Sequence, residues 1–74
     1  MASQAERHRA NWQDEIDSVA LYRALADLEA DPRLADVYRR LAAVEDRHAG
    51  FWEERLRAAG AAVPERRPGW RTRL

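Results

Sequence analysis

The chain has 74 residues, 13 basic and 13 acidic side chains, a formal net charge of zero and no cysteine. Its length permits one domain whose small core stabilises the fold by only a few kcal/mol, so a partner chain or a metal ion is expected to contribute. The balanced charge gives no field that attracts nucleic acid or an anionic membrane, and the lack of cysteine excludes disulfides and thiolate metal sites. With no signal peptide and no apolar run near the roughly 20 residues that span a bilayer, a cytoplasmic protein is expected.

Ser3 and Glu6 predict the start of a first helix. A serine followed three residues later by a glutamate has the form of a capping box, so the helix is expected to begin near Gln4. Neither Gly nor Pro interrupts the following sequence, and the helix is expected to continue to about Ala30.

Asp31-Pro32 predicts the start of a second helix, with the aspartate as N-cap and the proline at the first helical position. This helix is expected to end near Ala59, with Gly60 in the left-handed conformation after it. Because the intervening turn is very short, the two helices are expected to fold back side by side as an antiparallel hairpin.

The fold class expected is therefore all-α, with a helical hairpin over residues 1–60. Residues 61–74 contain two prolines, a glycine and several arginines, which predicts an extended or disordered tail or a linker. The arginines lie on no helical face, so no nucleic-acid partner is expected.

Two polar residues interrupt the apolar stripe of the second helix. At 100° per residue, Glu45 and His48 point along the stripe that is predicted to face the core. A lone carboxylate in such a place costs several kcal/mol or takes up a proton, so Glu45 needs a partner. His48 lies one turn further on the same face, and both side chains can reach one point. The stripe consists of Leu34, Val37, Tyr38, Leu41, Val44, Phe51, Trp52 and Leu56.

The first helix offers a second carboxylate, Glu15, in one arc with Trp12, Val19, Tyr22 and Ala26. A neighbouring arc carries three leucines, and such a wide apolar surface suits a helix that contacts both its hairpin mate and another chain. Tyr22, two turns after Glu15, can donate a hydrogen bond to a ligand carboxylate. The leucines are Leu21, Leu25 and Leu28.

These residues predict half of a metal site. Glu-x-x-His on an inward helix face is the ligand unit of di-iron carboxylate bundles, which use four Glu and two His for two irons. One hairpin offers Glu15, Glu45 and His48, and a two-fold homodimer would supply the other half while burying more apolar surface. The prediction is a shared di-iron site with one iron per chain, which Mn, Zn or Ca could also occupy.

Glu15, Tyr22 and the Glu45-x-x-His48 unit resemble the rubrerythrin and ferritin-like superfamily over about residues 8 to 59. The chain is most similar to its single-hairpin members, the encapsulated ferritins and the ferritin-like domain preceding some vacuolar-iron-transporter-type membrane proteins. This resemblance implies a homodimeric four-helix bundle with a shared ferroxidase centre, in some members assembled further into a ring of dimers. It also implies an encapsulin shell or a fused membrane iron transporter as partner.

The resemblance implies iron ligation by Glu15, Glu45 and His48, a supporting role for Tyr22 near the ligands, and an acidic entrance site at Asp14 and Asp17. The function expected is oxidation of Fe(II) to Fe(III), for storage or transport. One alternative is a non-catalytic helical-hairpin dimerisation module, in which polar residues on the stripe set the register of a seam. Another is a redox or peroxide sensor that uses the same site.

Overall fold

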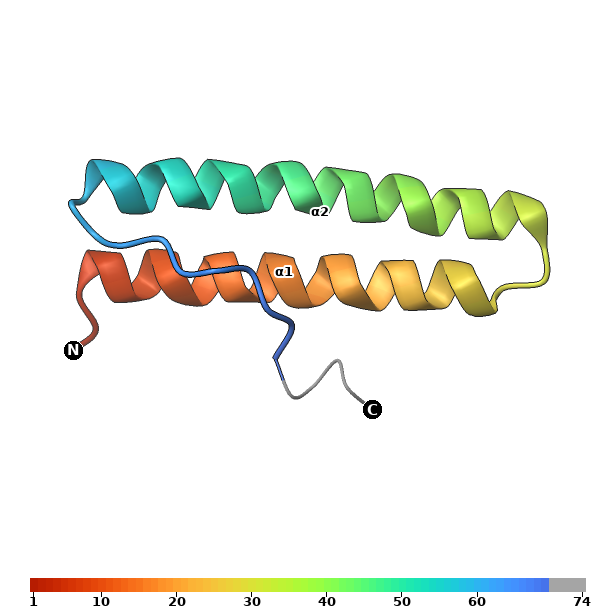
Figure 1. Cartoon of the computed structure of the whole chain (residues 1–74), viewed down its shortest axis with the longest axis horizontal. Helices are drawn as coiled ribbons and strands as arrows, with labels where there is room; N and C mark the ends of the chain where they lie inside the picture. The colour runs from red at the N-terminus through yellow and green to blue at the C-terminus, as the bar shows by residue number, and fades with distance from the viewer. Residues whose placement is uncertain (70–74) are drawn as a thin grey trace.

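The computed structural model is an all-α hairpin, as expected, and it describes residues 1–69. Helix α1 spans Gln4–Leu28 and helix α2 spans Pro32–Ala58, and this described part contains no strand (Figure 1). The molecule measures 43 × 22 × 20 Å, so its long axis is close to the length of one helix. Neither of these two helices is long and apolar enough to cross a membrane.

The predicted helix starts are confirmed by their capping hydrogen bonds. Ser3 Oγ accepts from the Glu6 amide at 3.1 Å, and Glu6 Oε1 accepts from the Ser3 amide at 3.3 Å, which completes the capping box. Asp31 Oδ1 accepts from the Arg33 amide at 2.9 Å. At the other end of α2, Gly60 has a φ of 72°, the left-handed conformation predicted for it.

The first helix ends slightly earlier than predicted. It stops at Leu28 rather than Ala30, because Glu29 is already extended with φ −80° and ψ 122°. This extended residue leads into Asp31, which must itself be non-helical to cap α2.

Small side chains form the α2 side of the contact between the helices. Its buried residues recur at seven-residue intervals, and so do three of the buried residues of α1. Since seven residues make about two helical turns, each series runs as a line along its helix. We call the two lines the seam; they are Trp12, Val19 and Ala26 on α1, and Ala35, Ala42, Ala49 and Leu56 on α2.

The large apolar side chains of α2 are mostly not in the seam. Of the stripe predicted to face the core, Leu56 is buried, but Leu34, Val37, Leu41 and Phe51 are between 38% and 50% exposed. The prediction is wrong for these four, because alanines make the contact with α1 and leave the larger side chains on a neighbouring face. We call these four residues the outer apolar face.

Residues 61–69 follow α2 as an irregular segment that turns back along α1 (Figure 1). Ala61 and Val63 pack against the core cluster of the hairpin. The last five residues of the predicted tail, 70–74, lie outside the described residues. The core cluster consists of Trp12, Ile16, Ala49 and Leu56.

Candidate metal site

The three predicted ligands lie together. Glu15 on α1 and Glu45 and His48 on α2 each offer one ligand atom, and these atoms are all within 4.8 Å of one another. His48 Nδ1 lies 3.6 Å from Glu15 Oε2 and 3.7 Å from Glu45 Oε1. Ligand atoms that sit about 2.0–2.2 Å from a shared cation are typically separated by such distances. The three side chains can therefore reach one ion.

The seam explains why the two carboxylates meet. Glu15 follows the seam residue Trp12 by three positions, and Glu45 follows the seam residue Ala42 by three positions. Both glutamates therefore occupy the same place relative to the helix–helix contact and project along the same side of it. His48, three residues after Glu45, joins them from the next turn of α2.

The surroundings of Glu15 disfavour the charged form of its carboxylate. Its Oε2 atom is buried and has no hydrogen-bond partner among the described residues. Burial, and then the neighbouring Glu45 carboxylate, raise the pKa of Glu15 to about 7, although His48 partly opposes this rise. A buried carboxylate oxygen without a hydrogen bond costs free energy, and a bound cation would compensate for the missing hydrogen bond. Two carboxylates and one imidazole suit Fe(II), Mn(II) or Zn(II).

The site opens toward the outer apolar face rather than into the hairpin. The His48 side chain is 54% exposed, whereas those of Glu15 and Glu45 are 21% and 23% exposed. Leu34, Leu41 and His48 recur at seven-residue intervals and so lie on one line of α2. The uncovered side of the ligand set is thus continuous with exposed apolar surface.

Tyr22 lies in an aromatic layer beside the site. It follows Glu15 by seven residues, and Tyr38 precedes Glu45 by seven. Their rings stack with centroids 6.4 Å apart and planes 22° apart. No hydrogen bond from Tyr22 to a ligand is found in the part of the chain that the structure describes, so the predicted supporting role stays a prediction.

His8 and Trp52 form the matching layer on the other side, seven residues before Glu15 and seven after Glu45. Their rings lie 5.4 Å apart at 37°, and His8 is half-buried. His8 is not among the site residues predicted from the sequence. Its seven-residue interval from Glu15 was the signal that could have found it.

Asp17, predicted at an entrance for cations, is buried with 8% of its surface exposed. Its Oδ1 accepts from Gln13 Nε2 at 2.9 Å and from the Gly69 amide at 2.6 Å, so the carboxylate faces the tail. Asp14 is exposed. The entrance role of both residues stays a prediction.

Comparison of the chain with protein-family models, with curated proteins and with solved structures found no match in any of the three. Support for a function therefore comes from the chain's own residues and their geometry.

Proposed function

We propose that this chain is a ferritin-like iron-binding protein that oxidises Fe(II) to Fe(III) at a di-iron centre shared by a homodimer. The observation that carries the proposal is the convergence of Glu15, Glu45 and His48 around a buried carboxylate oxygen that has no hydrogen-bond partner among the described residues. The pattern Glu-x-x-His, with one further glutamate from the other helix, is the half-set of ligands used by di-iron carboxylate bundles.

The openness of the site supports a shared centre. Three protein ligands leave a cation incompletely coordinated, and the uncovered side of the set adjoins the outer apolar face. A second copy related by two-fold symmetry would cover that face and bring a second Glu15, Glu45 and His48 to the same place. Four carboxylates would then balance the four positive charges of two Fe(II) ions.

Each residue has a role in the proposed reaction. Glu15 and Glu45 bind Fe(II) through carboxylate oxygens, and His48 binds it through a neutral ring nitrogen. Because burial and Glu45 raise the pKa of Glu15 to about 7, binding of Fe(II) near neutral pH displaces the proton from those Glu15 side chains that carry one. Two Fe(II) ions then give one electron each to dioxygen, which takes up two protons and leaves as hydrogen peroxide. The product is two Fe(III) ions, destined for a storage shell or a transporter.

The ligand roles are tested by Glu45→Ala and His48→Ala, with Glu54→Gln as the matched control. Glu54 is an exposed acid of the same helix that pairs only with Arg57 among the described residues. Fe(II)-dependent oxygen consumption by the purified protein should fall at least about 10–100-fold in both ligand variants, as expected for loss of a ligand rather than of an outer contact. The control should match the wild type. Unchanged turnover in Glu45→Ala would contradict the proposal.

The outer apolar face favours a second candidate, a non-catalytic helical-hairpin dimerisation module. Its four exposed side chains need a cover whether or not a metal binds. In this case chelators would leave the dimer unchanged, and Glu45→Leu would raise its melting temperature by removing a half-buried charge. The ferroxidase proposal expects the same variant to lose iron binding.

A further inference from the structure

The hairpin has two grooves, one on each side of the seam. The metal site lies along one, and residues 61–69, which we call the strap, lie along the other. Asp46 and Glu53, which contact the strap, lie about 100° and 80° round α2 from Glu45, across the seam. Asp17, which also contacts it, lies about 200° round α1 from Glu15. The strap therefore covers the groove opposite the metal site.

Arg66 fixes the middle of the strap to α2. Its Nε and Nη2 atoms donate to the two Glu53 oxygens at 2.7 and 3.0 Å, and its Nη1 donates to Asp46 Oδ1 at 2.7 Å. Glu53 Oε2 also accepts from Trp12 Nε1 at 3.0 Å, which extends the network to α1. A two-point contact between guanidinium and carboxylate is a strong and directional pairing.

A second set of contacts fixes the far end of the strap to α1. The Gly69 amide donates to Asp17 Oδ1 at 2.6 Å, and Gln13 Nε2 donates to the Arg67 carbonyl at 2.9 Å. A Cβ at position 69 would lie 3.2 Å from both Asp17 oxygens. The close approach of the backbone to this buried carboxylate therefore favours glycine.

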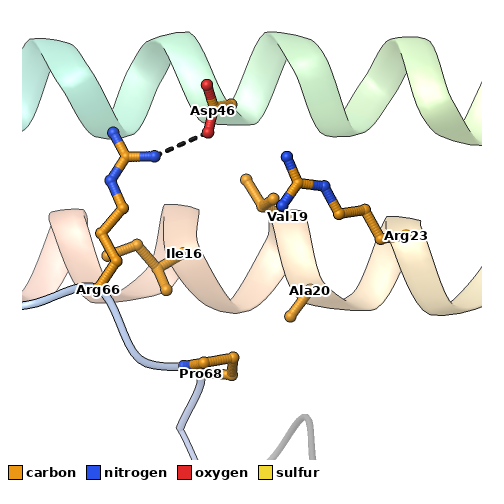
Figure 2. A pocket seen from close by; sticks show the side chains of 7 residues that line it. All are labelled: Ile16, Val19, Ala20, Arg23, Asp46, Arg66 and Pro68. Atoms are coloured by element: carbon orange, nitrogen blue, oxygen red, sulfur yellow. Dashed lines mark hydrogen bonds and ion pairs between the residues drawn. The ribbon is translucent and has the colours of Figure 1, made fainter.

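Apolar packing secures only the first part of the strap, where Ala61 and Val63 contact the core cluster. Further along, a cavity of about 150 Å³ remains between Pro68 and α1, with Arg66 on one side and the Arg23 guanidinium on the other (Figure 2). Its apolar lining on α1 consists of Ile16, Val19 and Ala20. The far half of the strap is thus held by hydrogen bonds and ion pairs more than by packing.

We propose that the strap occupies its groove and thereby prevents a second copy of the chain from binding there. A second copy can then pair only through the groove that carries the metal site. Without the strap, both grooves would offer apolar surface to another hairpin, because Ile16 and Ala20, which line the cavity beside the strap, would lose that cover. The strap fills that groove from within the same chain and leaves the outer apolar face free. The identity of the free groove as a metal site rests on the proposed function; the covering of the other groove does not.

The test is Arg66→Gln in the full chain, with Arg67→Gln as the matched control, since Arg67 pairs through its side chain with Glu65 of the strap itself. Three quantities are measured: hydrogen exchange of the Gly69 amide, mass by sedimentation, and Fe(II) bound per chain. We expect Arg66→Gln to accelerate Gly69 exchange at least tenfold and to form assemblies larger than the wild type, with iron binding retained. Arg67→Gln should match the wild type in all three.

A wild-type mass in Arg66→Gln, despite fast exchange at Gly69, would overturn the proposal, as would exchange as slow as in the control. If Arg66→Gln does not fold, Gly69→Ala replaces it, because the added methyl group crowds Asp17 without removing a charge. The same measurements of amide exchange at position 69 and of mass then apply, with the same expected results. If Arg66→Gln forms larger assemblies but the wild type binds no iron, the proposed role of the strap is supported and the proposed ferroxidase function is refuted. The two proposals therefore fail separately.

Discussion

Glu15 is the residue at which burial and charge conflict most clearly. Its side chain is 21% exposed, its Oε2 atom has no hydrogen-bond partner in the described chain, and its pKa is about 7 because of burial and the nearby Glu45 carboxylate. In the metal-free protein the folded chain therefore holds this proton more tightly than the unfolded chain, whose glutamate titrates near 4.5. Stability must then fall as the pH rises through this interval.

The first prediction is that Glu15→Gln stabilises the metal-free protein at pH 8. The glutamine carries no charge to bury, so the loss of stability between about pH 4.5 and pH 7 should largely disappear, with a gain of about 1–3 kcal/mol at pH 8. Urea unfolding at several pH values in the presence of chelator measures the pH dependence of stability and the gain at pH 8. The same variant should bind Fe(II) poorly. An unaltered pH dependence would show that Glu15 is not the group under strain.

The pKa of Glu53 is shifted in the opposite direction, to below its usual value. The hydrogen bonds from Arg66 hold the pKa of Glu53 below its usual value against the opposing effect of burial, and the Trp12 indole lowers it further. The stability that this pairing contributes is present above the unfolded pKa of about 4.5 and is lost as the pH falls through the folded pKa.

The second prediction follows from the lowered pKa of Glu53. Wild type should melt at a higher temperature than Arg66→Gln at pH 7, and the difference should shrink steadily below about pH 4.5 as Glu53 takes up a proton. Thermal unfolding of both proteins from pH 3 to pH 7 provides the comparison. A difference that stays constant over this range would mean that the ion pair contributes nothing to the docking of the strap.

The proposed ligands were easier to predict from the sequence than the strap contacts. Glu45 and His48 stand out because a helix repeat places them among apolar residues, and this repeat is visible in the sequence. The pairing of Arg66 with Glu53 has no such signal, since a tail without a repeat gives no direction for its side chains. Position 69 was likewise predicted to lie in an extended or disordered tail, because the buried partner of its amide lies 52 residues earlier in the chain.

At the scale of the elements, the ends of the helices were predictable and their contact was not. Ser3, Asp31 and Gly60 act through local hydrogen bonds and backbone conformation, so their neighbours in sequence reveal them. The contact of α2 with α1 uses Ala35, Ala42 and Ala49 instead of the larger side chains. Hydrophobicity alone ranks leucine above alanine and therefore pointed to the wrong face.

The third prediction tests this alanine seam. Ala42 is 3% exposed, so Ala42→Leu should force extra atoms into a filled contact and destabilise the hairpin by about 1–3 kcal/mol. Ala43→Leu is the matched control, because Ala43 is the exposed neighbour on the same helix. Chemical denaturation of both variants gives the difference. Equal stabilities would mean that the helices do not meet along Ala42.

At the scale of the whole molecule, a hairpin with a filled seam and a strapped groove still has a large apolar surface to cover, that of the outer apolar face. The outer apolar face and the open side of the candidate metal site lie together on that surface. Joining them across a two-fold axis would complete the ligand set and bury the exposed side chains in one step. A single-chain sequence signals the need for a partner but carries no information on how the two copies cross.

The fourth prediction concerns that surface. Phe51→Glu should yield a monomer by placing a charge in the proposed interface, and it should lower iron binding with it. Leu21→Glu is the matched control: both residues are 50% exposed, but Leu21 lies about 120° round α1 from Glu15. Sedimentation at equal protein concentration compares them. A dimer in Phe51→Glu would place the interface elsewhere.

The most direct test of the proposed di-iron centre is an anaerobic titration of the metal-free protein with Fe(II), followed by air, with mass recorded throughout. The proposal predicts saturation at one iron per chain, a dimer at saturation, and a ferric absorbance after air is admitted. No Fe(II) binding, with the mass unchanged, would contradict it and leave Glu45 and His48 as polar residues on the face of a structural hairpin.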